Sequence, residues 1–269
     1  MLDLVVQIVN YNSLSYTQNC LASLIKELDL CNLKYKIIIW DNNSDEDFQG
    51  WADKITDQRI KFYFSEQNIG FGQAHNAMGK FFESKYSFVL NPDTIIENNT
   101  VKNMYDFMEN HPEAGMCGPR ITLPGYTYFF HKDQFWPREF VIKDFFEKIL
   151  GIKIWQNLSH LEHASIVGSV LFIRKEVFDK VGGFDPNYFL YFEEGDLENA
   201  IIKLGYKIYF LYNAQVVHYY GKSSKNIRWK IKIFQQSREY FRKKWKIKTT
   251  WLDRHVIDPI QNYVLRFYL

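Results

Sequence analysis

Residues 4–41, LVVQIVNYNSLSYTQNCLASLIKELDLCNLKYKIIIWD, contain two short apolar runs separated by a segment with helical spacing. The runs, Leu4–Val9 and Tyr35–Trp40, have the length and the β-branched content of buried strands. Between them the apolar residues recur at intervals of three and four, which predicts an amphipathic helix. These residues are Leu21, Leu24, Ile25 and Leu28. A strand, a helix and a second strand together favour an α/β fold.

The same alternation continues along the first hundred residues. Further strands are predicted at Lys61–Phe64 and Tyr86–Leu90, and a helix at Val101–Met108. We therefore expect an α/β fold with a mostly parallel sheet covered by helices. Polar motifs follow three of the strands, namely Asn10-Tyr11-Asn12, Asp41–Asp45 and Asn91-Pro92-Asp93. Because open α/β sheets bind ligands at the carboxyl ends of their strands, these motifs predict one polar crevice.

The bulk composition indicates one large domain, or a domain followed by a tail. The chain has 269 residues, of which 46% are apolar and 18% aromatic, enough for a substantial core. Three cysteines without metal-like spacing are expected to be free thiols in a reducing cytosol. The sequence shows no signal-peptide pattern and no apolar run of about 18 residues. We therefore expect a cytoplasmic protein without a spanning helix.

Two aspartates at predicted strand ends are candidate ligands. Asp41 can accept a hydrogen bond from a uracil or thymine imide, or from a ribose hydroxyl; the alternative is a turn or helix-capping aspartate. Asp93 follows Pro92, which turns the backbone out of the strand. One carboxylate together with diphosphate oxygens and water is the usual ligand set of Mg²⁺. The alternative is a plain Asn-Pro-Asp turn.

The segment Phe192–Leu197 contains three acids in an apolar frame, Glu193, Glu194 and Asp196. Crowded carboxylates in a partly dry setting raise at least one pKa, which suits a general base. The alternative is a helix N-terminus enriched in acids. His218 follows the strand-like Ala214–Val217 and is either a metal or phosphate ligand or a structural histidine. His75 is expected to pack or to face solvent at the start of a helix.

Two stretches depart from the strand–helix alternation. Pro119–Leu161 is rich in aromatic residues with irregular spacing, and we interpret it as a loop or subdomain over the crevice. Strand character returns at Ser165–Arg174, a helix is predicted at Lys175–Val181, and another strand at Lys207–Leu211. The second departure is the tail: between Lys222 and Lys248 there are eleven Lys or Arg residues against one acid, Glu239.

The tail is a candidate membrane contact. Ile227–Trp245 has the pattern of an amphipathic helix whose basic side chains can meet anionic lipids. Its aromatic residues, expected to seat at the interface, are Trp229, Phe234, Tyr240, Phe241 and Trp245. The alternative is a solvated helix that packs on the domain or on a second copy in a homodimer. Nucleic-acid binding is not expected, because the rest of the chain is not basic and carries no such motif.

Taken in order, these motifs resemble those of the family 2 glycosyltransferases, most closely their rhamnosyltransferase-like bacterial branch. The resemblance rests on Ile8–Asn12, Asp41–Asp45, Asn68–Asn76, Leu90–Asp93 and Val167–Leu197, and it covers residues 2–222 approximately. The last stretch is the most specific, because it matches the branch pattern around Gly-Gly-Phe-Asp and the acidic motif over its whole length. The acidic motif departs from the family's Glu-Asp-x-Asp, and the Cys-x-Arg that often follows is Glu198-Asn199-Ala200 here.

The resemblance implies a GT-A fold, a nucleotide-diphosphate sugar donor, a divalent metal (Mn²⁺ or Mg²⁺) and inverting transfer. It assigns nucleotide-sugar binding to Asn10, Tyr11, Asn12, Asp41, Asn43, Asn68, Gly70, Asn76 and Asn91. It assigns the metal to Asp93 and His218, and the base to Glu194, where the family has the Asp of Glu-Asp. Because Glu is longer than Asp, Asp196 and Glu193 remain alternatives for the base.

The resemblance also implies the domain organisation and the substrate classes. Residues 1–222 would form the GT-A domain, with a nucleotide-sugar-binding half (1–118) and an acceptor-binding, catalytic half (119–222), before the tail (223–269). The donor would be dTDP-rhamnose or a UDP-hexose, because thymine and uracil present the same imide edge. The acceptor would be a glycan or a lipid-linked glycan of bacterial surface polysaccharide synthesis, with the enzyme peripheral at the inner face of the cell membrane. The alternative is a catalytically degenerate nucleotide-sugar-binding or scaffold protein, which the altered acidic motif favours.

Overall fold

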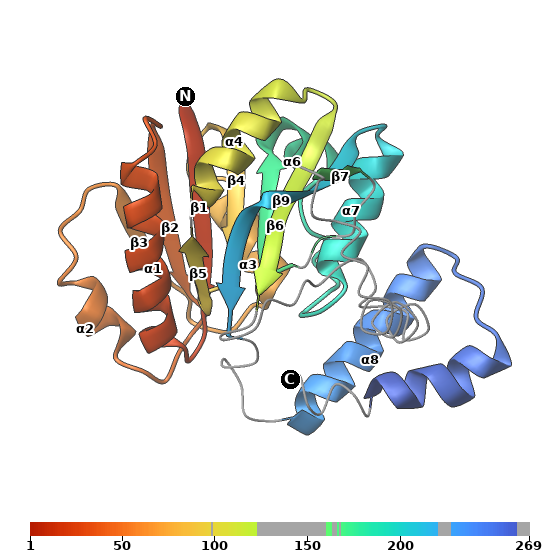
Figure 1. Cartoon of the computed structure of the whole chain (residues 1–269). Coiled ribbons are helices and arrows are strands. Elements are labelled where there is room, and N and C mark those ends of the chain that lie inside the picture. Colours follow the sequence, from red (N-terminus) through yellow and green to blue (C-terminus); the bar gives the residue numbers. More distant parts are fainter. Residues whose placement is uncertain (98, 123–159, 163–165, 167, 220–226, 263–269) are drawn as a thin grey trace, which may run out of the picture.

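The computed structural model describes residues 1–97, 99–122, 160–162, 166, 168–219 and 227–262 (Figure 1). The strands are β1 (Leu2–Asn10), β2 (Tyr35–Asp41), β3 (Ile60–Phe64), β4 (Ser84–Leu90), β5 (Thr94–Glu97), β6 (Ala114–Thr122), β7 (His160–Glu162), β8 (Val170–Arg174) and β9 (Lys207–His218). The helices are α1 (Leu14–Asp29), α2 (Phe48–Ala52), α3 (Phe71–Met78), α4 (Thr100–Asn110), α6 (Lys175–Val181), α7 (Glu193–Lys203) and α8 (Ile227–Lys244), with a π-helical stretch η2 (Asp253–Ile257).

All of these strands belong to one sheet in the order β3-β2-β1-β4-β8-β6-β9-β5, with β7 paired to β9. The half made of β3, β2, β1 and β4 is parallel, as the βαβ pattern predicts. The other half is mixed, because β8 is antiparallel to both β4 and β6, whereas β6 and β9 are parallel. The α/β class is therefore confirmed, but the mostly parallel arrangement holds only for the first half. The sheet becomes mixed at β8, because this strand lies beside β4 and runs antiparallel to it.

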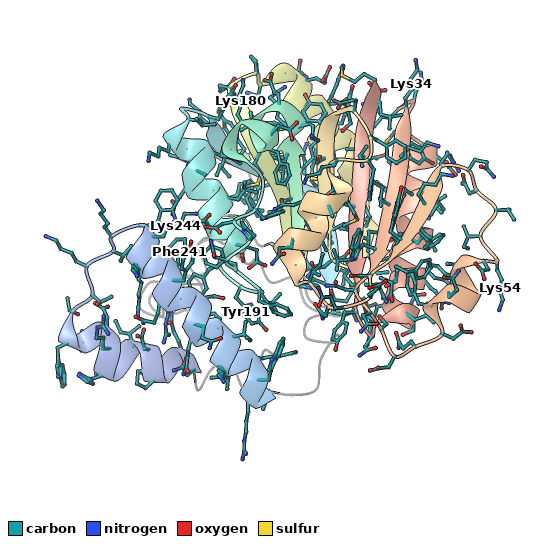
Figure 2. The ribbon with its side chains drawn as sticks, turned by 180° about the vertical axis from the view of Figure 1, so that it is seen from behind. Lys34, Lys54, Lys180, Tyr191, Phe241 and Lys244 are labelled. Carbon is teal, nitrogen blue, oxygen red and sulfur yellow. The ribbon has the colours of Figure 1, made fainter. Side chains whose placement is uncertain are left out.

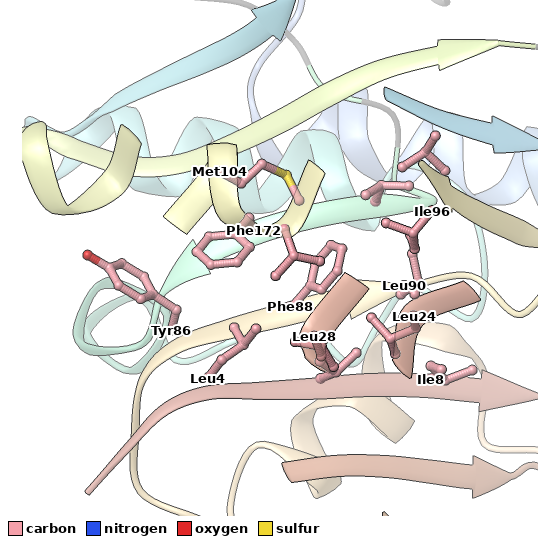
Figure 3. Packing of buried hydrophobic residues seen from close by; sticks show 14 of the residues in the cluster. Leu4, Ile8, Leu24, Leu28, Tyr86, Phe88, Leu90, Ile96, Met104 and Phe172 are labelled. Atoms are coloured by element: carbon pink, nitrogen blue, oxygen red, sulfur yellow. The ribbon is translucent and has the colours of Figure 1, made fainter. Parts of the chain in front are cut away.

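The core lies on both faces of the sheet. Leu4 and Ile8 of β1 point to the face covered by α1 and α4, where they pack with Phe88 and Phe172 (Figure 3). The intervening Val5 packs on the opposite face against α3. Helices α6 and α7 cover the adjoining part of that second face. Because both faces are covered, the strands are continuous apolar runs rather than alternating ones.

The first four strands and helices α4 and α6 lie within two residues of their predicted bounds. Strand β9 continues to His218 instead of ending at Leu211. Strands β5 and β6 were not anticipated: β5 has only four residues, and β6 contains Gly and Pro, which disfavour strands. Most of the aromatic stretch expected to cover the crevice lies outside the described residues. Cys20, Cys31 and Cys117 are free, as predicted.

The tail helix α8 packs on the domain. Phe234 is 8% exposed and packs with Tyr188 and Phe192, and the Ser237 hydroxyl donates to the Leu190 carbonyl at 2.8 Å. All five aromatic residues expected at a membrane interface contact residues between 188 and 196 instead, namely Trp229, Phe234, Tyr240, Phe241 and Trp245. These contacts favour the alternative that the helix packs on the domain, because residues 188–196 offer its aromatic side chains a surface to pack on. Among the described helices, none is both long and apolar enough to cross a membrane.

Candidate active site

The carboxyl ends of the parallel strands meet at one edge of the sheet. Asn10, the last residue of β1, is paired with Asp41, the last residue of β2. Asp41 is paired in turn with Phe64 of β3, and Ile8 of β1 with Leu90 of β4. The polar motifs that follow these strands therefore lie beside one another, at the edge where α/β sheets bind ligands.

The Asp41 carboxylate is buried and held by two neighbours. Its Oδ1 accepts from Asn10 Nδ2 at 2.7 Å and from Ser44 Oγ at 2.6 Å, and its Oδ2 accepts from the Ser44 backbone N–H at 3.0 Å. The Asn10 side-chain oxygen accepts from the hydroxyls of Ser13 and Thr17. Asn10 thus positions Asp41. Among the described residues, Asp41 Oδ2 accepts one hydrogen bond, which leaves it capacity for a further donor.

The loop after β1 is tied to the loop after β2. Asn12 Nδ2 donates to Asp45 Oδ2 at 3.2 Å, and Asn12 Oδ1 accepts from the Asp45 backbone N–H at 2.7 Å. Asn12 and Asn43 have left-handed φ angles of 49° and 64°, a conformation in which Asn is enriched. Tyr11 is half-buried and Asn43 is exposed at the same corner. These contacts give the two loops one fixed shape beside Asp41.

Asn42, which no sequence pattern singled out, organises a third loop. Its Nδ2 donates to Asn68 Oδ1 at 2.9 Å and to the Gly70 carbonyl at 3.1 Å, and its Oδ1 accepts from the Ile69 N–H at 3.0 Å. Gly70 has a φ of 85°, and a Cβ there would lie 2.4 Å from the Phe189 carbonyl oxygen. Only glycine fits where this loop passes the segment that leads to α7. A middle residue in an Asp-Asn-Asn-Ser cluster carries no signal that would reveal such a role.

The candidate Asn76 and the neighbouring His75, both on α3, are engaged in contacts within the domain. Asn76 Nδ2 donates to the Phe184 carbonyl at 2.7 Å, and Asn76 Oδ1 accepts from the Phe184 N–H at 2.9 Å. His75 is fully buried, with Nδ1 3.2 Å from Gln7 Oε1, and burial lowers the pKa of its ring to about 3. These bonds fasten α3 to the turn before α7 and to β1, and they favour a structural role for Asn76.

Asp93 and His218 are brought together across 125 positions of sequence. His218 Nε2 lies 3.0 Å from Asp93 Oδ1, and the two side chains are 6% and 9% exposed, respectively. The pairing follows from the antiparallel register of β5 and β9, which places Thr94 opposite His218. Burial alone would raise the pKa of the Asp93 carboxyl, but His218, a backbone hydrogen bond and, least of the three, Lys230 of α8 together hold that pKa below its usual value.

The Asp93–His218 pair fits part of a metal site. A carboxylate is the ligand that Mg²⁺ and Mn²⁺ prefer, and imidazole is the commonest metal ligand in proteins. Throughout the described ranges, no three His, Cys, Asp or Glu residues gather at one point. A metal held by this pair would therefore take its remaining ligands from water and a bound diphosphate, as Mg²⁺ usually does.

The acidic motif forms the first turn of α7, at the same edge of the sheet. A Cβ added at Gly168 would lie 3.1 Å from the carboxyl carbon of Glu194, so Glu194 packs against this backbone. The next residue, Ser169, accepts a hydrogen bond from the Asn91 N–H at 2.8 Å. Glu194 therefore packs beside Gly168, and the next residue, Ser169, is bonded to Asn91. Asn91 lies two positions before Asp93 in the sequence.

Glu193 and Glu194 both have raised pKa values. Burial raises the pKa of each carboxyl, and at Glu193 the negative charge of Glu194 adds to the effect. Backbone N–H groups, including that of Gly168, oppose the shift at Glu194. Within the part of the chain that the structure describes, Oε2 of each residue is buried without a hydrogen-bond partner. An unpaired buried oxygen is costly, so these atoms mark a position where a ligand hydroxyl would be favoured.

Asp196, in contrast, is occupied by the tail. It is 3% exposed and accepts from Lys244 Nζ at 2.7 Å, from Trp245 Nε1 at 2.8 Å and from the Tyr188 hydroxyl at 3.3 Å. Lys244 also donates to Asp185 at 2.7 Å. Figure 2 shows Lys244 where α8 meets α7. The tail therefore fixes the orientation of the acidic turn.

A mixed α/β sheet with carboxylates, amides and a histidine at one edge is typical of proteins that bind nucleotide ligands there. The sequence profile described as "Glycosyl transferase family 2" matches residues 5–182, about two thirds of the chain. The chain therefore belongs to this family, and the resemblance seen in its motifs is confirmed.

Two relatives are rhamnosyltransferases. N-acetylglucosaminyl-diphospho-decaprenol L-rhamnosyltransferase of Mycobacterium tuberculosis (strain ATCC 25618 / H37Rv) is 26% identical over 183 residues, and the match covers 58% of each chain. Rhamnosyltransferase WbbL of Escherichia coli (strain K12) is 24% identical over 245 residues, which cover 80% of this chain and 86% of WbbL. The chain thus spans less than two thirds of the mycobacterial relative that it matches.

The fold is shared with solved glycosyltransferases. Mannosyltransferase PcManGT from Pyrobaculum calidifontis, solved in complex with GDP-Man and Mn²⁺, aligns with a TM-score of 0.65 at 15% identity. The alignment covers 99% of this chain and 73% of that one. At this identity the likeness concerns the fold alone, and it confirms the expected GT-A architecture.

Proposed function

We propose that the protein is an inverting glycosyltransferase that moves a sugar from a nucleotide-diphosphate donor to an acceptor hydroxyl. The observation that carries this proposal is the pair of buried, unpartnered Oε2 atoms of Glu193 and Glu194 within the described site. They lie at the sheet edge that also holds the Asp93–His218 pair. Glycosyl transfer needs a group that takes a proton from the nucleophile and a group that holds the leaving diphosphate, and this edge offers both.

For the donor we favour dTDP-rhamnose over a UDP-hexose. Asp41 Oδ2 can accept a hydrogen bond from the imide N–H that thymine and uracil share. The choice of sugar is supported by two relatives whose names describe rhamnosyl transfer. Asn10 and Asn42 act on the donor indirectly, by positioning Asp41 and the loop of Asn68–Gly70.

For the acceptor we favour a lipid-linked glycan at the inner face of a bacterial cell membrane. The mycobacterial relative is named for an acceptor in which N-acetylglucosamine is joined through a diphosphate to a polyprenol. An acceptor of this class stays in the bilayer while its sugar reaches the enzyme, so the enzyme must work at the membrane surface. The basic excess of the tail is compatible with that location.

Asp93 and His218 would hold the divalent cation, Mn²⁺ or Mg²⁺. Bound there, the cation would neutralise charge on the diphosphate leaving group. The depressed pKa of Asp93 keeps its carboxylate ionised at neutral pH, which suits it to hold a cation. The pairing of β5 with β9 holds His218 beside Asp93, so the two side chains are already positioned in the absence of a ligand.

Glu194 is the proposed base. Its carboxylate takes the proton of the acceptor hydroxyl while the acceptor oxygen bonds to the anomeric carbon. The bond from that carbon to the donor diphosphate breaks, the nucleoside diphosphate leaves, and the configuration inverts. A pKa raised by burial brings Glu194 closer to the operating pH, where a general base is most effective. Asp196 anchors the turn to the tail, and Glu193 is the second candidate because it shares the unpaired, buried environment.

Thermal-shift measurements with dTDP, UDP, GDP and CDP, each with and without Mn²⁺, test the proposal. A ligand at 100 times its Kd stabilises the folded state by about 2.7 kcal/mol. We expect a metal-dependent shift with dTDP and UDP, and a smaller one with GDP and CDP. Absence of a shift for every nucleotide would overturn the proposal. Nucleotide binding without sugar transfer to a polyprenyl-diphosphate-linked acceptor would support the catalytically degenerate alternative.

A further inference from the structure

The segment that follows α8 exposes a cluster of large apolar side chains. Residues 251–262 are helical and include η2. The exposed fractions here are 42% for Ile247, 70% for Trp251, 39% for Leu252, 37% for Val256 and 48% for Ile260. Three of them recur every four residues, a spacing that places side chains on one side of a helix. We call these five residues the terminal apolar face.

The terminal apolar face belongs to a segment that is firmly held. Arg242 Nη1 and Nη2 donate to the two carboxylate oxygens of Asp258 at 2.7 and 2.8 Å, and Arg238 Nη1 lies 3.2 Å from the same carboxylate. Asp253 accepts from the Thr250 N–H at 2.6 Å and from its hydroxyl at 2.7 Å. The apolar side chains therefore face solvent because α8 fixes the orientation of the segment.

Within residues 243–262 the exposed charges are all positive; the exposed acid beside this segment, Glu239 of α8, is paired with Arg242 at 3.1 Å. Lys243, Lys246, Lys248 and Arg254 are exposed. The two acids of residues 243–262, Asp253 and Asp258, are 8% and 7% exposed and are bonded within the tail. The segment thus combines exposed apolar side chains with exposed cations, and its two acids are buried. This combination is complementary to a membrane surface, which has anionic headgroups above an apolar interior.

We infer that the terminal apolar face, with its flanking lysines and arginine, docks the protein on an anionic membrane. The apolar side chains would enter the boundary between headgroups and acyl chains, and the cations would meet the phosphates. The aromatic side of α8 is not this contact, because Phe234, Tyr240 and Phe241 pack against the domain.

The position of the face suits the proposed acceptor. Figure 1 shows α8 and the terminal helix on the side of the sheet toward which the carboxyl ends of β1 and β4 point. Lys244 and Trp245, which precede the face, bind Asp196 in the acidic turn. Docking through this face would hold the catalytic edge near the bilayer. The inference deepens the proposed function and rests on it for the acceptor, but docking itself needs no donor or acceptor.

Vesicle co-sedimentation of the full chain tests the inference. The probe is vesicles of equal phosphatidylcholine and phosphatidylglycerol, compared with phosphatidylcholine alone, at low and high salt. Each basic side chain near an anionic surface strengthens binding about fivefold. We expect Lys246→Gln/Lys248→Gln to weaken binding about 25-fold at low salt, and Trp251→Ser/Ile260→Ser to weaken it at least about tenfold. High salt should remove most of the difference that the lysines make.

Matched variants elsewhere serve as controls. Lys34→Gln/Lys54→Gln changes the same charge at exposed sites, which Figure 2 shows at the other end of the molecule. Leu30→Ser/Leu204→Ser removes exposed apolar groups, of 68% and 48% exposure, outside the terminal face. Both controls should pellet like the wild type. Failure of the wild type to pellet, or equal pelleting of test and control variants, would overturn the inference.

Two further measurements separate the outcomes. If sedimentation velocity shows that Trp251→Ser/Ile260→Ser converts a dimer into a monomer while vesicle binding is unchanged, the face is an interface between two copies and the inference fails. The thermal shift with dTDP is measured on the same variants. Retained nucleotide shifts with lost vesicle binding support docking. Vesicle binding without any nucleotide shift supports docking and refutes the proposed transfer.

Discussion

Substituting Glu194 and Asp196 one at a time should separate the base from the anchor of the acidic turn. The resemblance to the family motif leaves both acids as candidates for the base, but the structure gives them different surroundings. Glu194 has a buried oxygen without a partner among the described residues, whereas Asp196 accepts from Lys244, Trp245 and Tyr188. We therefore expect Glu194→Gln to remove activity and Asp196→Asn to remove stability.

The sizes of the two effects follow from these contacts. Loss of a general base lowers kcat by about 10²–10⁴-fold, which is roughly 3–5 kcal/mol of activation free energy. Breaking a fully buried ion pair costs about 3–5 kcal/mol. The Lys244 side chain is 33% exposed, so we discount this to about 2 kcal/mol for Asp196→Asn. That loss corresponds to a fall in Tm of about 4–8 °C.

Glu194→Gln should leave Tm unchanged or raise it at pH 8. Burial disfavours the ionised form of Glu194, so the neutral amide avoids that cost. Tm is measured by thermal unfolding of the purified variants, and kcat by release of nucleoside diphosphate with a polyprenyl-diphosphate-linked acceptor, well below the lowest Tm. Asp196→Asn should keep kcat within about tenfold of the wild type, since loss of a base costs at least about 100-fold. A 100-fold loss of kcat in Asp196→Asn with an unchanged Tm would refute the reasoning and place the base at Asp196.

Three further predictions concern the rest of the site. Asp93→Asn should abolish the Mn²⁺-dependent part of the thermal shift with dTDP, and His218→Ala should reduce it, because these side chains form the proposed metal pair; an unaltered Mn²⁺ dependence in both variants would exclude the pair. Glu193 has a folded-state pKa raised above its unfolded value, so the wild type should lose stability as pH rises above about 4.5 toward that folded pKa. Glu193→Gln should escape this loss, gaining up to about 1.4 kcal/mol per pH unit relative to wild type in that window; denaturant unfolding at pH 5 and pH 8 measures it, and a constant difference would contradict it. Gly70→Ala should lower the free energy of unfolding by about 1–3 kcal/mol or more, because its Cβ would meet the Phe189 carbonyl oxygen at a positive φ; unfolding at the wild-type denaturant midpoint would contradict the steric argument.

The local sequence predicts helices and strands correctly where the spacing of the apolar residues fits only one kind of element. The apolar runs that form β1, β2 and β4 are buried on both faces, so hydrophobic pattern and tertiary environment favour the same structure. The polar motifs after them could be placed at one edge because parallel strands share their carboxyl ends. The same local reasoning does not predict β5, which is only four residues long, or β6, which contains Gly and Pro. Their pairing with β9 is a long-range contact.

The basic and aromatic composition of the tail did not decide which surface α8 contacts. An amphipathic, basic and aromatic pattern fits a membrane-seated helix and a helix packed on an aromatic domain equally well. The structure favours the second for α8, because Phe234 packs on Phe192 and Lys244 binds the buried carboxylate of Asp196 and the half-buried one of Asp185. The exposed apolar face lies instead in the segment after α8, where the sequence pattern had drawn no attention.

The sequence by itself determined the α/β class, the four-strand parallel half and the order of the polar motifs, because these follow from local periodicity and from motif spacing. Only the tertiary structure decided which acidic side chains are hydrogen-bonded and which keep a buried oxygen without a partner among the described residues. The Asp93–His218 contact depends on the register of β5 with β9, and the engagement of Asp196 depends on where α8 docks. Such contacts join residues far apart in the chain. Their geometry is set by packing of the whole domain, which no local pattern encodes.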